Sequence, residues 1–255
     1  MNITSYRRNA GVLAACMAFV TLAIIASCKK DEDTHTSPPD ELFSTVTIGS
    51  HAWMTENLNV VTYADGTPIP QVSDSIEWLY LTTGAWCWYQ NDSATYASSY
   101  GRLYNWYAVA GIYDAASKAN PALRKKLAPL GWHVPTDAEW SDMINSLDST
   151  ADGGSNFSNI AGGKMKTTGT IEDGDGLWFA PNEMASNSSG FSGAPVGMRD
   201  DYGGFLAVGY FGNWWSSSEV DSLNAWFRFL GKDDGSARRY YDLKNNGFSV
   251  RCIKD

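Results

Sequence analysis

The segment GWHVPTDAEW, residues 131–140, places a histidine and two acidic residues within ten positions, which would suit a metal site or acid–base chemistry. The same residues also match a helix start. Thr136 and Glu139 have the T-x-x-E spacing of a capping box, and Pro135 precedes them. The apolar residues of the expected helix then recur on one face: Trp140, Met143, Ile144 and Leu147. We therefore predict structural roles for Thr136, Glu139 and Trp140, and expect His133 to be a hydrogen-bonded structural residue.

Other residues that could support catalysis are few. From residue 42 onward the chain has only two histidines, His51 and His133, and neither a G-x-S-x-G nor an H-E-x-x-H motif. No pair of carboxylates stands out from the other acidic residues. Cys87 and Cys252 form either one disulfide or two buried thiols, since their spacing does not reveal whether they meet. We expect no enzymatic activity.

One short acidic loop has the appearance of a calcium site. Asp173 and Asp175 lie in EDGDG, residues 172–176, which has the D-x-D-G pattern but lacks the other ligand positions of an EF-hand. A segment of similar composition begins at Asp148. Acids and glycines also form solvated turns, and we favour that interpretation for both loops. We expect no cofactor, and calcium is the one ion left open.

Aromatic and arginine side chains are dense in the last third of the chain, and both are typical of binding surfaces. The alternative is that the rings fill the core of a domain that has few leucines, and we expect most of them to be buried. Alternation in NAWFRFLG, residues 224–231, places Trp226, Arg228 and Leu230 on one face. The arginine indicates that this face is at least partly exposed to solvent. The arginines could bind a carboxylate through two hydrogen bonds each. The candidate ligand-binding residues are Trp214, Trp215, Trp226, Arg228, Arg238 and Tyr240, with Arg239 and Tyr241 beside them.

The elements that must position these side chains are mostly short strands. Alternating, β-branched residues predict two strands over residues 44–54 with a turn at Gly49 and Ser50. Residues 97–111 carry apolar residues at helical spacing, and residues 116–131 allow one short helix. Strand-like runs separated by Gly, Asn and Asp fill the last third. The prediction is an α+β fold with small twisted antiparallel sheets, two or so helices and long loops.

The N-terminal residues predict export and lipidation. Arg7 and Arg8 precede an apolar run that ends in IASC, so residues 1–27 are predicted to be a lipoprotein signal peptide and Cys28 the lipidated residue. KKDED follows and resembles the acidic export tag of surface lipoproteins in Bacteroides-type bacteria. Residues 28–41 form a polar tether, and residues 42–255 a single domain. The acidic balance, with a net charge of −9, argues against a nucleic-acid partner. We expect an outer-membrane lipoprotein that faces the cell surface and contacts the membrane through its lipid alone.

Eight ordered motifs between Thr45 and Lys254 carry a resemblance to a known family. They are TVTIGSHAWMTENLNV, YADGTPIP, LTTGAWCWYQND, YGRLYNWYAV, GWHVPTDAEW, AGGKMKTTG, NWWSSSE and GFSVRCIKD. Together they resemble the Fibrobacter succinogenes major paralogous domain, a family of exported bacterial modules. That family is similar to the C-type-lectin-like fold of formylglycine-generating enzymes. The marks of this fold are Pro135, Thr136, Glu139 and Trp140 at the helix start, and Gly247, Phe248 and Arg251 near the end.

The resemblance implies a function and also shows departures from the pattern. Ala128 stands where family members often have a cysteine, so Cys252 lacks the partner that the resemblance implies. The paired copper-binding cysteines of formylglycine-generating enzymes and the sugar-binding triplets of true lectins are both absent. We expect a non-catalytic domain that binds an extracellular glycan or a surface protein. The alternatives are a structural module of a surface assembly and a degenerate enzyme of the formylglycine-generating type.

Overall fold

The computed structural model describes residues 43–155 and 157–255 of the chain. These residues belong to one compact unit, Ser37–Asp255. The predicted signal peptide, the lipidated Cys28 and the tether lie outside the described residues. Within the described part, no helix combines the length and the hydropathy that crossing a membrane requires.

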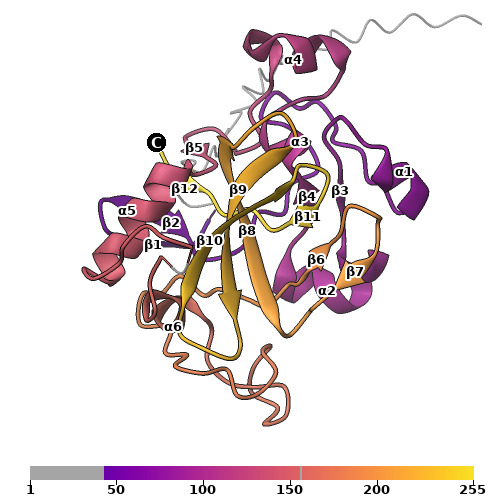
Figure 1. The fold of residues 1–255 in the computed structure, drawn as a ribbon. Coiled ribbons are helices and arrows are strands. Elements are labelled where there is room, and N and C mark those ends of the chain that lie inside the picture. The colour runs from indigo at the N-terminus through magenta and orange to yellow at the C-terminus, as the bar shows by residue number, and fades with distance from the viewer. Residues whose placement is uncertain (1–42, 156) are drawn as a thin grey trace, which may run out of the picture. The chain divides into compact units, whose positions relative to one another are not determined.

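The unit is of the α+β class, with three small sheets whose neighbouring strands are antiparallel (Figure 1). The first sheet joins the two ends of the unit, because a strand near residue 253 pairs with the hairpin that begins at residue 45. Its order is β1 (Thr45–Ile48), β2 (His51–Met54), β12 (Ile253–Lys254) and β5 (Trp132–His133). The predicted hairpin is confirmed, and its turn uses Gly49 with a φ of 61°, a backbone conformation that favours glycine.

The second sheet is built from strands of two or three residues drawn from distant parts of the chain. Its order is β3 (Trp86–Cys87), β4 (Leu103–Asn105), β11 (Gly247–Phe248), β6 (Met198–Arg199) and β7 (Phe205–Leu206). The third sheet has the longest strands and lies across the front of the view in Figure 1. Its order is β10 (Ala237–Leu243), β9 (Asn224–Gly231) and β8 (Phe211–Glu219), so β10 is an edge strand.

The described residues contain six α-helices, more than the two or so that the sequence predicts. They are α1 (Ser75–Leu79), α2 (Ser93–Tyr100), α3 (Trp106–Val109), α4 (Ala115–Ala119), α5 (Asp137–Leu147) and α6 (Ala161–Met165), together with the 3₁₀ turns η2 (Tyr89–Asn91) and η3 (Pro121–Leu123). Most are single turns, which periodicity detects poorly. Five of the six begin at an Asp, Asn or Thr whose side chain accepts from a backbone N–H of the first turn.

Helix α5 begins at the predicted capping box. The Thr136 hydroxyl accepts from the backbone N–H of Glu139 at 3.2 Å, and the Glu139 carboxylate accepts from the Thr136 N–H at 2.7 Å. Trp140, Met143 and Ile144 are buried as predicted, and Trp140 packs against Trp53 with ring centroids 4.8 Å apart. The expected amphipathic helix is therefore confirmed.

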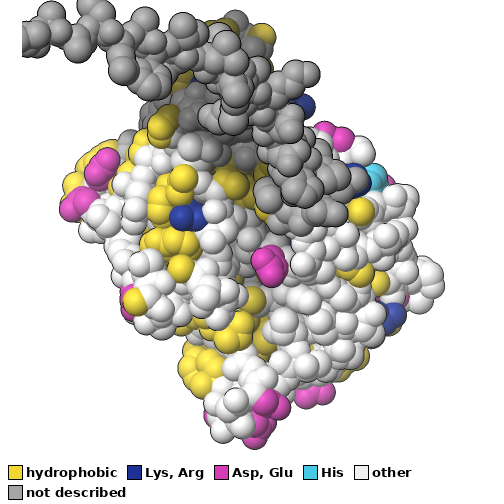
Figure 2. Space-filling view, turned by 180° about the vertical axis from the view of Figure 1, so that it is seen from behind, with side chains coloured by type: hydrophobic (Ala, Val, Ile, Leu, Met, Phe, Trp, Pro, Cys, Tyr) yellow, Lys and Arg dark blue, Asp and Glu magenta, His cyan; other side chains and the backbone are white. Residues whose placement is uncertain are grey.

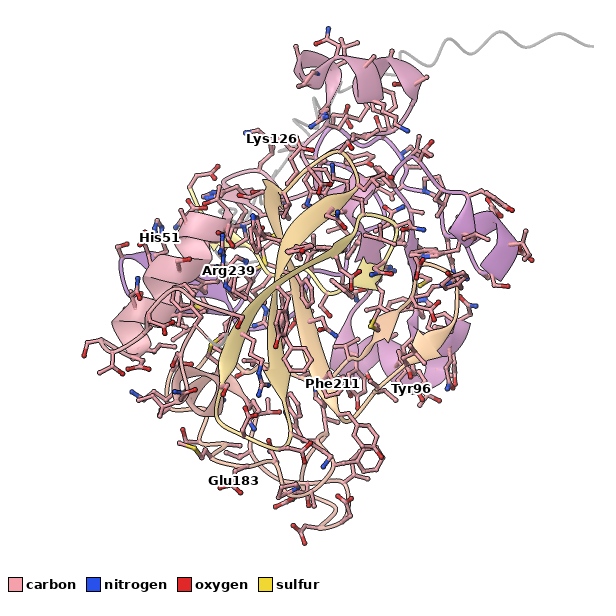
Figure 3. All side chains as sticks on the ribbon, in the orientation of Figure 1. His51, Tyr96, Lys126, Glu183, Phe211 and Arg239 are labelled. Atoms are coloured by element: carbon pink, nitrogen blue, oxygen red, sulfur yellow. The ribbon has the colours of Figure 1, made fainter. Side chains whose placement is uncertain are left out.

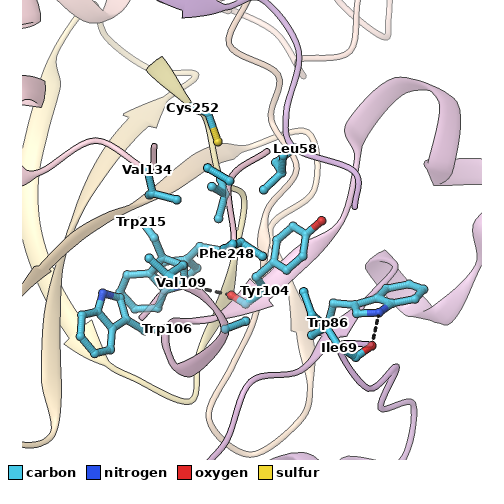
Figure 4. Packing of buried hydrophobic residues seen from close by; sticks show 14 of the residues in the cluster. Leu58, Ile69, Trp86, Tyr104, Trp106, Val109, Val134, Trp215, Phe248 and Cys252 are labelled. Carbon is cyan, nitrogen blue, oxygen red and sulfur yellow. Dashed lines mark hydrogen bonds between the residues drawn. The ribbon is translucent and has the colours of Figure 1, made fainter. Parts of the chain in front are cut away.

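The core is made largely of aromatic rings. Eight tryptophans are fully buried: Trp53, Trp78, Trp106, Trp132, Trp140, Trp178, Trp214 and Trp215. Figure 4 shows part of the largest cluster, where Trp215 and Phe248 pack with ring centroids 4.3 Å apart. Cys87 and Cys252 are free, buried thiols in separate clusters. Of the two alternatives for these cysteines, the structure has the buried thiols and not the disulfide.

Candidate functional site

Two of the predicted binding residues do not lie at the surface. Trp214 and Trp215 are fully buried, and their indole N–H groups donate to Asn57 Oδ1 at 2.8 Å and to the Tyr104 carbonyl at 2.9 Å. Trp214 belongs to the core cluster that contains Trp140 of α5, and Trp215 belongs to the cluster that contains Trp106 of α3 and Phe248 of β11. Since the two residues alternate along β8, both faces of the strand are covered. Neither ring can therefore stack on a ligand, and the prediction of ligand contacts is wrong for both.

Arg228 is also buried. The expectation that this face of β9 is exposed to solvent is therefore wrong at Arg228. Alternation does place it on the same face as Trp226, but α5 covers it. Nη1 donates to Asp137 Oδ1 at 2.7 Å, and Nη2 donates to the Asp137 carbonyl at 2.9 Å and to Ser141 Oγ at 3.0 Å. Arg228 therefore anchors the first turn of α5 to the sheet.

A groove of about 670 Å³ lies beside the β9 and β10 strands. Three groups of residues line it: Gly153–Ser155 as one wall, Trp226 and Phe227 of β9, and Arg239–Asp242 of β10. Tyr241 is 57% exposed and Tyr240 is 38% exposed, while Trp226 is half-buried. We call this feature the β10 groove. It contains the predicted residues Trp226, Tyr240 and Tyr241, together with Arg239.

The β10 groove has a rigid floor. The Arg239 guanidinium lies 3.5 Å from the centroid of the Trp226 ring, and Tyr241 meets the same indole edge to face at 5.6 Å. The guanidinium is also held from the side, since Nη2 and Nε donate to Asp137 Oδ2 at 2.7 and 3.0 Å. Figure 3 shows Arg239 between α5 and the strands. Stacking and a two-point ion pair together hold the side chain in one orientation.

Asp137 serves both arginines at once. Burial opposes its ionisation, but hydrogen bonds and charge from Arg239 and Arg228 outweigh burial and lower the pKa of Asp137 below its usual value. The carboxylate is therefore ionised at neutral pH. Asp137 of the PTDAEW motif thus shapes the β10 groove. Sequence reasoning missed this role because an aspartate in the first turn of a helix is already explained by its favourable interaction with the helix dipole.

Part of the β10 edge is already paired. The Arg239 N–H donates to the Ser155 carbonyl at 2.9 Å, and Ala237 exchanges two hydrogen bonds with Ser158. Since backbone groups alternate along a strand, the N–H and C=O of Tyr241 also point away from β9. No described residue pairs with them, so they add a donor and an acceptor to the groove.

Arg238 lies on the opposite face of β10. It pairs with Asp234 and stacks over Phe229 at 5.4 Å. Ring contacts on that face join Phe211 to Phe229 at 4.8 Å and Phe229 to Tyr240 at 5.9 Å. Tyr210, Phe211, Phe229 and Tyr240 form a partly exposed row that we call the aromatic strip. The predicted site residues are thus divided between two faces of one strand.

Comparison with known proteins identifies the family of the chain. A family described as the Fibrobacter succinogenes major domain matches residues 46–254, which is most of the chain. The chain belongs to the Fibrobacter succinogenes major domain family. No curated protein and no solved structure shows significant similarity to it.

Within this Fibrobacter succinogenes major domain, the C-terminal motif GFSVR has scaffold roles. Arg251 is buried and donates to the carbonyls of Met54 and Phe191 at 2.9 and 2.6 Å and to Asn57 Oδ1 at 2.9 Å. Burial lowers the pKa of Arg251 to about 9. Gly247 sits in the middle of the second sheet, where a Cβ would lie 3.0 Å from Trp78 and 3.1 Å from Arg199. These residues hold distant segments together.

His133 hydrogen-bonds as predicted. Nε2 lies 3.0 Å from Glu139 Oε1 and Nδ1 lies 2.7 Å from Asp255 Oδ1. Partial burial opposes protonation, but the two carboxylate hydrogen bonds outweigh it and raise the pKa of His133 above its ordinary value. The residue links strand β5, helix α5 and the end of the chain.

The acidic loop of the domain is closed by its own hydrogen bonds. Thr170 donates to Asp173 Oδ2 at 2.7 Å through its hydroxyl and to Asp175 Oδ1 at 2.9 Å through its N–H. In the described ranges, no three His, Cys, Asp or Glu side chains gather in a way that could hold a metal ion. These bonds form a turn around Thr170, and the choice between a solvated turn and a calcium site at Asp173 and Asp175 stays a prediction.

The two thiols lack the environment of a reactive cysteine. Burial raises the pKa of the Cys87 thiol to about 12, and burial also raises the pKa of Cys252 strongly. At neutral pH both remain protonated. Their observable role is to fill core space beside aromatic rings.

Proposed function

We propose that this chain is a non-catalytic binding domain that holds an extracellular glycan in the β10 groove. The observation that carries the proposal is the exposed Tyr241 ring beside the Trp226 indole, which Arg239 and Asp137 hold in place. Aromatic faces contact the C–H surfaces of sugar rings, and a preorganised floor reduces the entropy lost on binding. Hydroxyls of the sugar would bond to Ser155, to the Tyr241 backbone and to Arg239.

The proposal includes a C-type-lectin-like fold and a lipid anchor. The antiparallel sheets, the pairing of β12 with the N-terminal hairpin and the long loops between α5 and β8 support the fold. The IASC sequence supports acylation of Cys28 and a surface-facing position on the outer membrane. Radiolabelled palmitate should enter the wild-type chain and fail to enter Cys28→Ser. Equal labelling of both chains would contradict the anchor.

The test of glycan binding uses a polysaccharide panel and the full chain in detergent. Tyr241→Ala and Trp226→Ala should each weaken binding about tenfold, equivalent to about 1.4 kcal/mol. Tyr80→Ala is the matched control, because Tyr80 is exposed at the end of α1, outside the β10 groove, and its loss should leave binding unchanged. Binding that survives both groove substitutions in folded protein would place the ligand elsewhere.

A second candidate function is assembly with another surface protein through the aromatic strip. Tyr210 is 44% exposed and Phe211 is half-buried, and rows of aromatic rings are typical of protein interfaces. Chemical crosslinking in cells followed by mass spectrometry should then recover one partner, and Phe211→Ser should abolish that crosslink. The same substitution should leave glycan binding in the β10 groove intact.

A further inference from the structure

We infer that the ligand of the β10 groove carries carboxylates, and that it is a polysaccharide containing uronic acids. This inference rests on the proposed function and specifies its substrate class. It follows from how charge is distributed around Asp137.

Two guanidinium groups share one carboxylate at this point. Arg228 and Arg239 both pair with Asp137, at 2.7 Å in each case. Arg228 is fully buried, and a buried cation needs a close anion to offset its lost hydration. Arg239 lies at the groove and is 27% exposed. The three groups carry one net positive charge, although the whole chain carries −9.

One nitrogen of Arg239 is left for a ligand. Nε and Nη2 donate to Asp137, whereas Nη1 donates to no described residue. Since the guanidinium is clamped between Asp137 and the Trp226 ring, Nη1 keeps a defined direction. A rigid N–H pair beside the exposed Tyr241 ring is suited to a carboxylate held at a set distance from a sugar ring.

The neighbouring charged groups do not cancel this preference. Asp242 also borders the groove, but alternation along β10 directs its side chain to the face opposite Arg239 and Tyr241. Asp152 precedes the wall and does not line the groove, and its carboxylate accepts from the Gly154 N–H at 2.8 Å. Arg238 is paired with Asp234 on the opposite face. Figure 2 shows the molecule from behind, and on the described part of that face the lysine and arginine side chains are separated from one another.

A uronic acid fits these features better than an acidic peptide. Its carboxylate is attached directly to the sugar ring, so that stacking on Tyr241 and pairing with Arg239 occur in one rigid unit. A glutamate or aspartate side chain would lose rotamer entropy to reach the same nitrogen. The ring hydroxyls also match the unpaired N–H and C=O of Tyr241.

Calorimetry with the full chain in detergent tests this choice with polygalacturonate, the same polymer after carboxyl reduction, and poly-L-glutamate. Polygalacturonate should bind at least tenfold more tightly than the reduced polymer. Arg239→Gln should remove that difference and leave the weak binding of the reduced polymer in place. Arg239→Lys should give an intermediate preference, because it keeps the charge without the two-point contact to Asp137. Lys118→Gln, which removes an exposed cation on α4, should behave as wild type.

The outcomes separate this inference from the proposed function. Equal binding of both polysaccharides, lost in Tyr241→Ala, would overturn the preference for carboxylates and leave glycan binding standing. Poly-L-glutamate binding as tightly as polygalacturonate through Arg239 would overturn the assignment to a sugar. If no saccharide binds to folded protein, the proposed function fails. Thermal unfolding of each variant establishes that it is folded.

Discussion

Nη1 of Arg228 donates to Oδ1 of Asp137 across 2.7 Å, and this contact joins the middle of strand β9 to the first turn of helix α5. It links the helix-start motif at residues 131–140 to the surface where we place the ligand. Because the same carboxylate also holds Arg239, one side chain couples the stability of the core to the shape of the β10 groove.

Replacing Asp137 by alanine should destabilise the fold strongly. The change leaves Arg228 buried without an anion, and breaking a buried pair by removing one partner costs about 3–5 kcal/mol. Urea unfolding should show this loss as a lower midpoint. Asp142→Ala is the control on the same helix, since Asp142 is exposed, and it should change stability by less than about 0.5 kcal/mol. Similar losses in both variants would mean that Asp137 acts as a helix residue only.

His133 should make stability depend on pH. Its folded pKa is raised, so protonation favours the folded state: the contribution is complete below the unfolded value of about 6.5 and is lost as pH rises through the folded pKa. The stability difference between wild type and His133→Gln should therefore shrink between pH 5.5 and 8.5. In Asp255→Asn, an NMR titration should report a lower pKa for His133. A difference that stays constant across this range would rule out the charged bridge.

Lys166 should have the opposite effect in the alkaline range. Its ammonium donates to the carbonyls of Glu183, Gly231 and Asp234 at 2.7, 3.0 and 2.9 Å, and burial lowers its pKa to about 8. An unfolded lysine titrates near 10.4, so between these values the unfolded state binds more protons and stability rises with pH, by at most about 1.4 kcal/mol per pH unit. In urea unfolding, the free energy of unfolding of wild type should increase relative to that of Lys166→Met between pH 8 and pH 10. Parallel pH profiles would show that the pKa is unshifted.

The buried thiols should resist modification in the native protein. Cys87 and Cys252 are inaccessible and protonated, so a short pulse of iodoacetamide at pH 8 should leave both unlabelled. The same pulse in 8 M urea should label both, as peptide mass spectrometry would show. Labelling of either cysteine in folded protein, or recovery of a Cys87–Cys252 disulfide, would contradict the structure.

Local features were predicted well because their causes are local. The capping box needs only Thr136 and Glu139 at the right spacing, and alternation along residues 224–231 needs only the strand itself. The helix count was too low because single turns such as α3 are stabilised by capping and by tertiary packing, with too few residues for a periodic pattern. The residues predicted to contact a ligand are divided by burial, and their role in binding stays a prediction. Trp226, Tyr240 and Tyr241 lie at the β10 groove, whereas Trp214 and Trp215 do not.

The sequence by itself determined the α+β class, the start of helix α5, the faces of the long strands and the family to which the motifs point. Only the tertiary structure decided that β8 is covered on both faces while β10 is an edge, and therefore which rings meet solvent. It also decided that Asp137 meets Arg228 and Arg239 from about a hundred residues away. Sequence periodicity reports which side chains share a face, but burial depends on what packs against that face, and here distant segments of the chain do so.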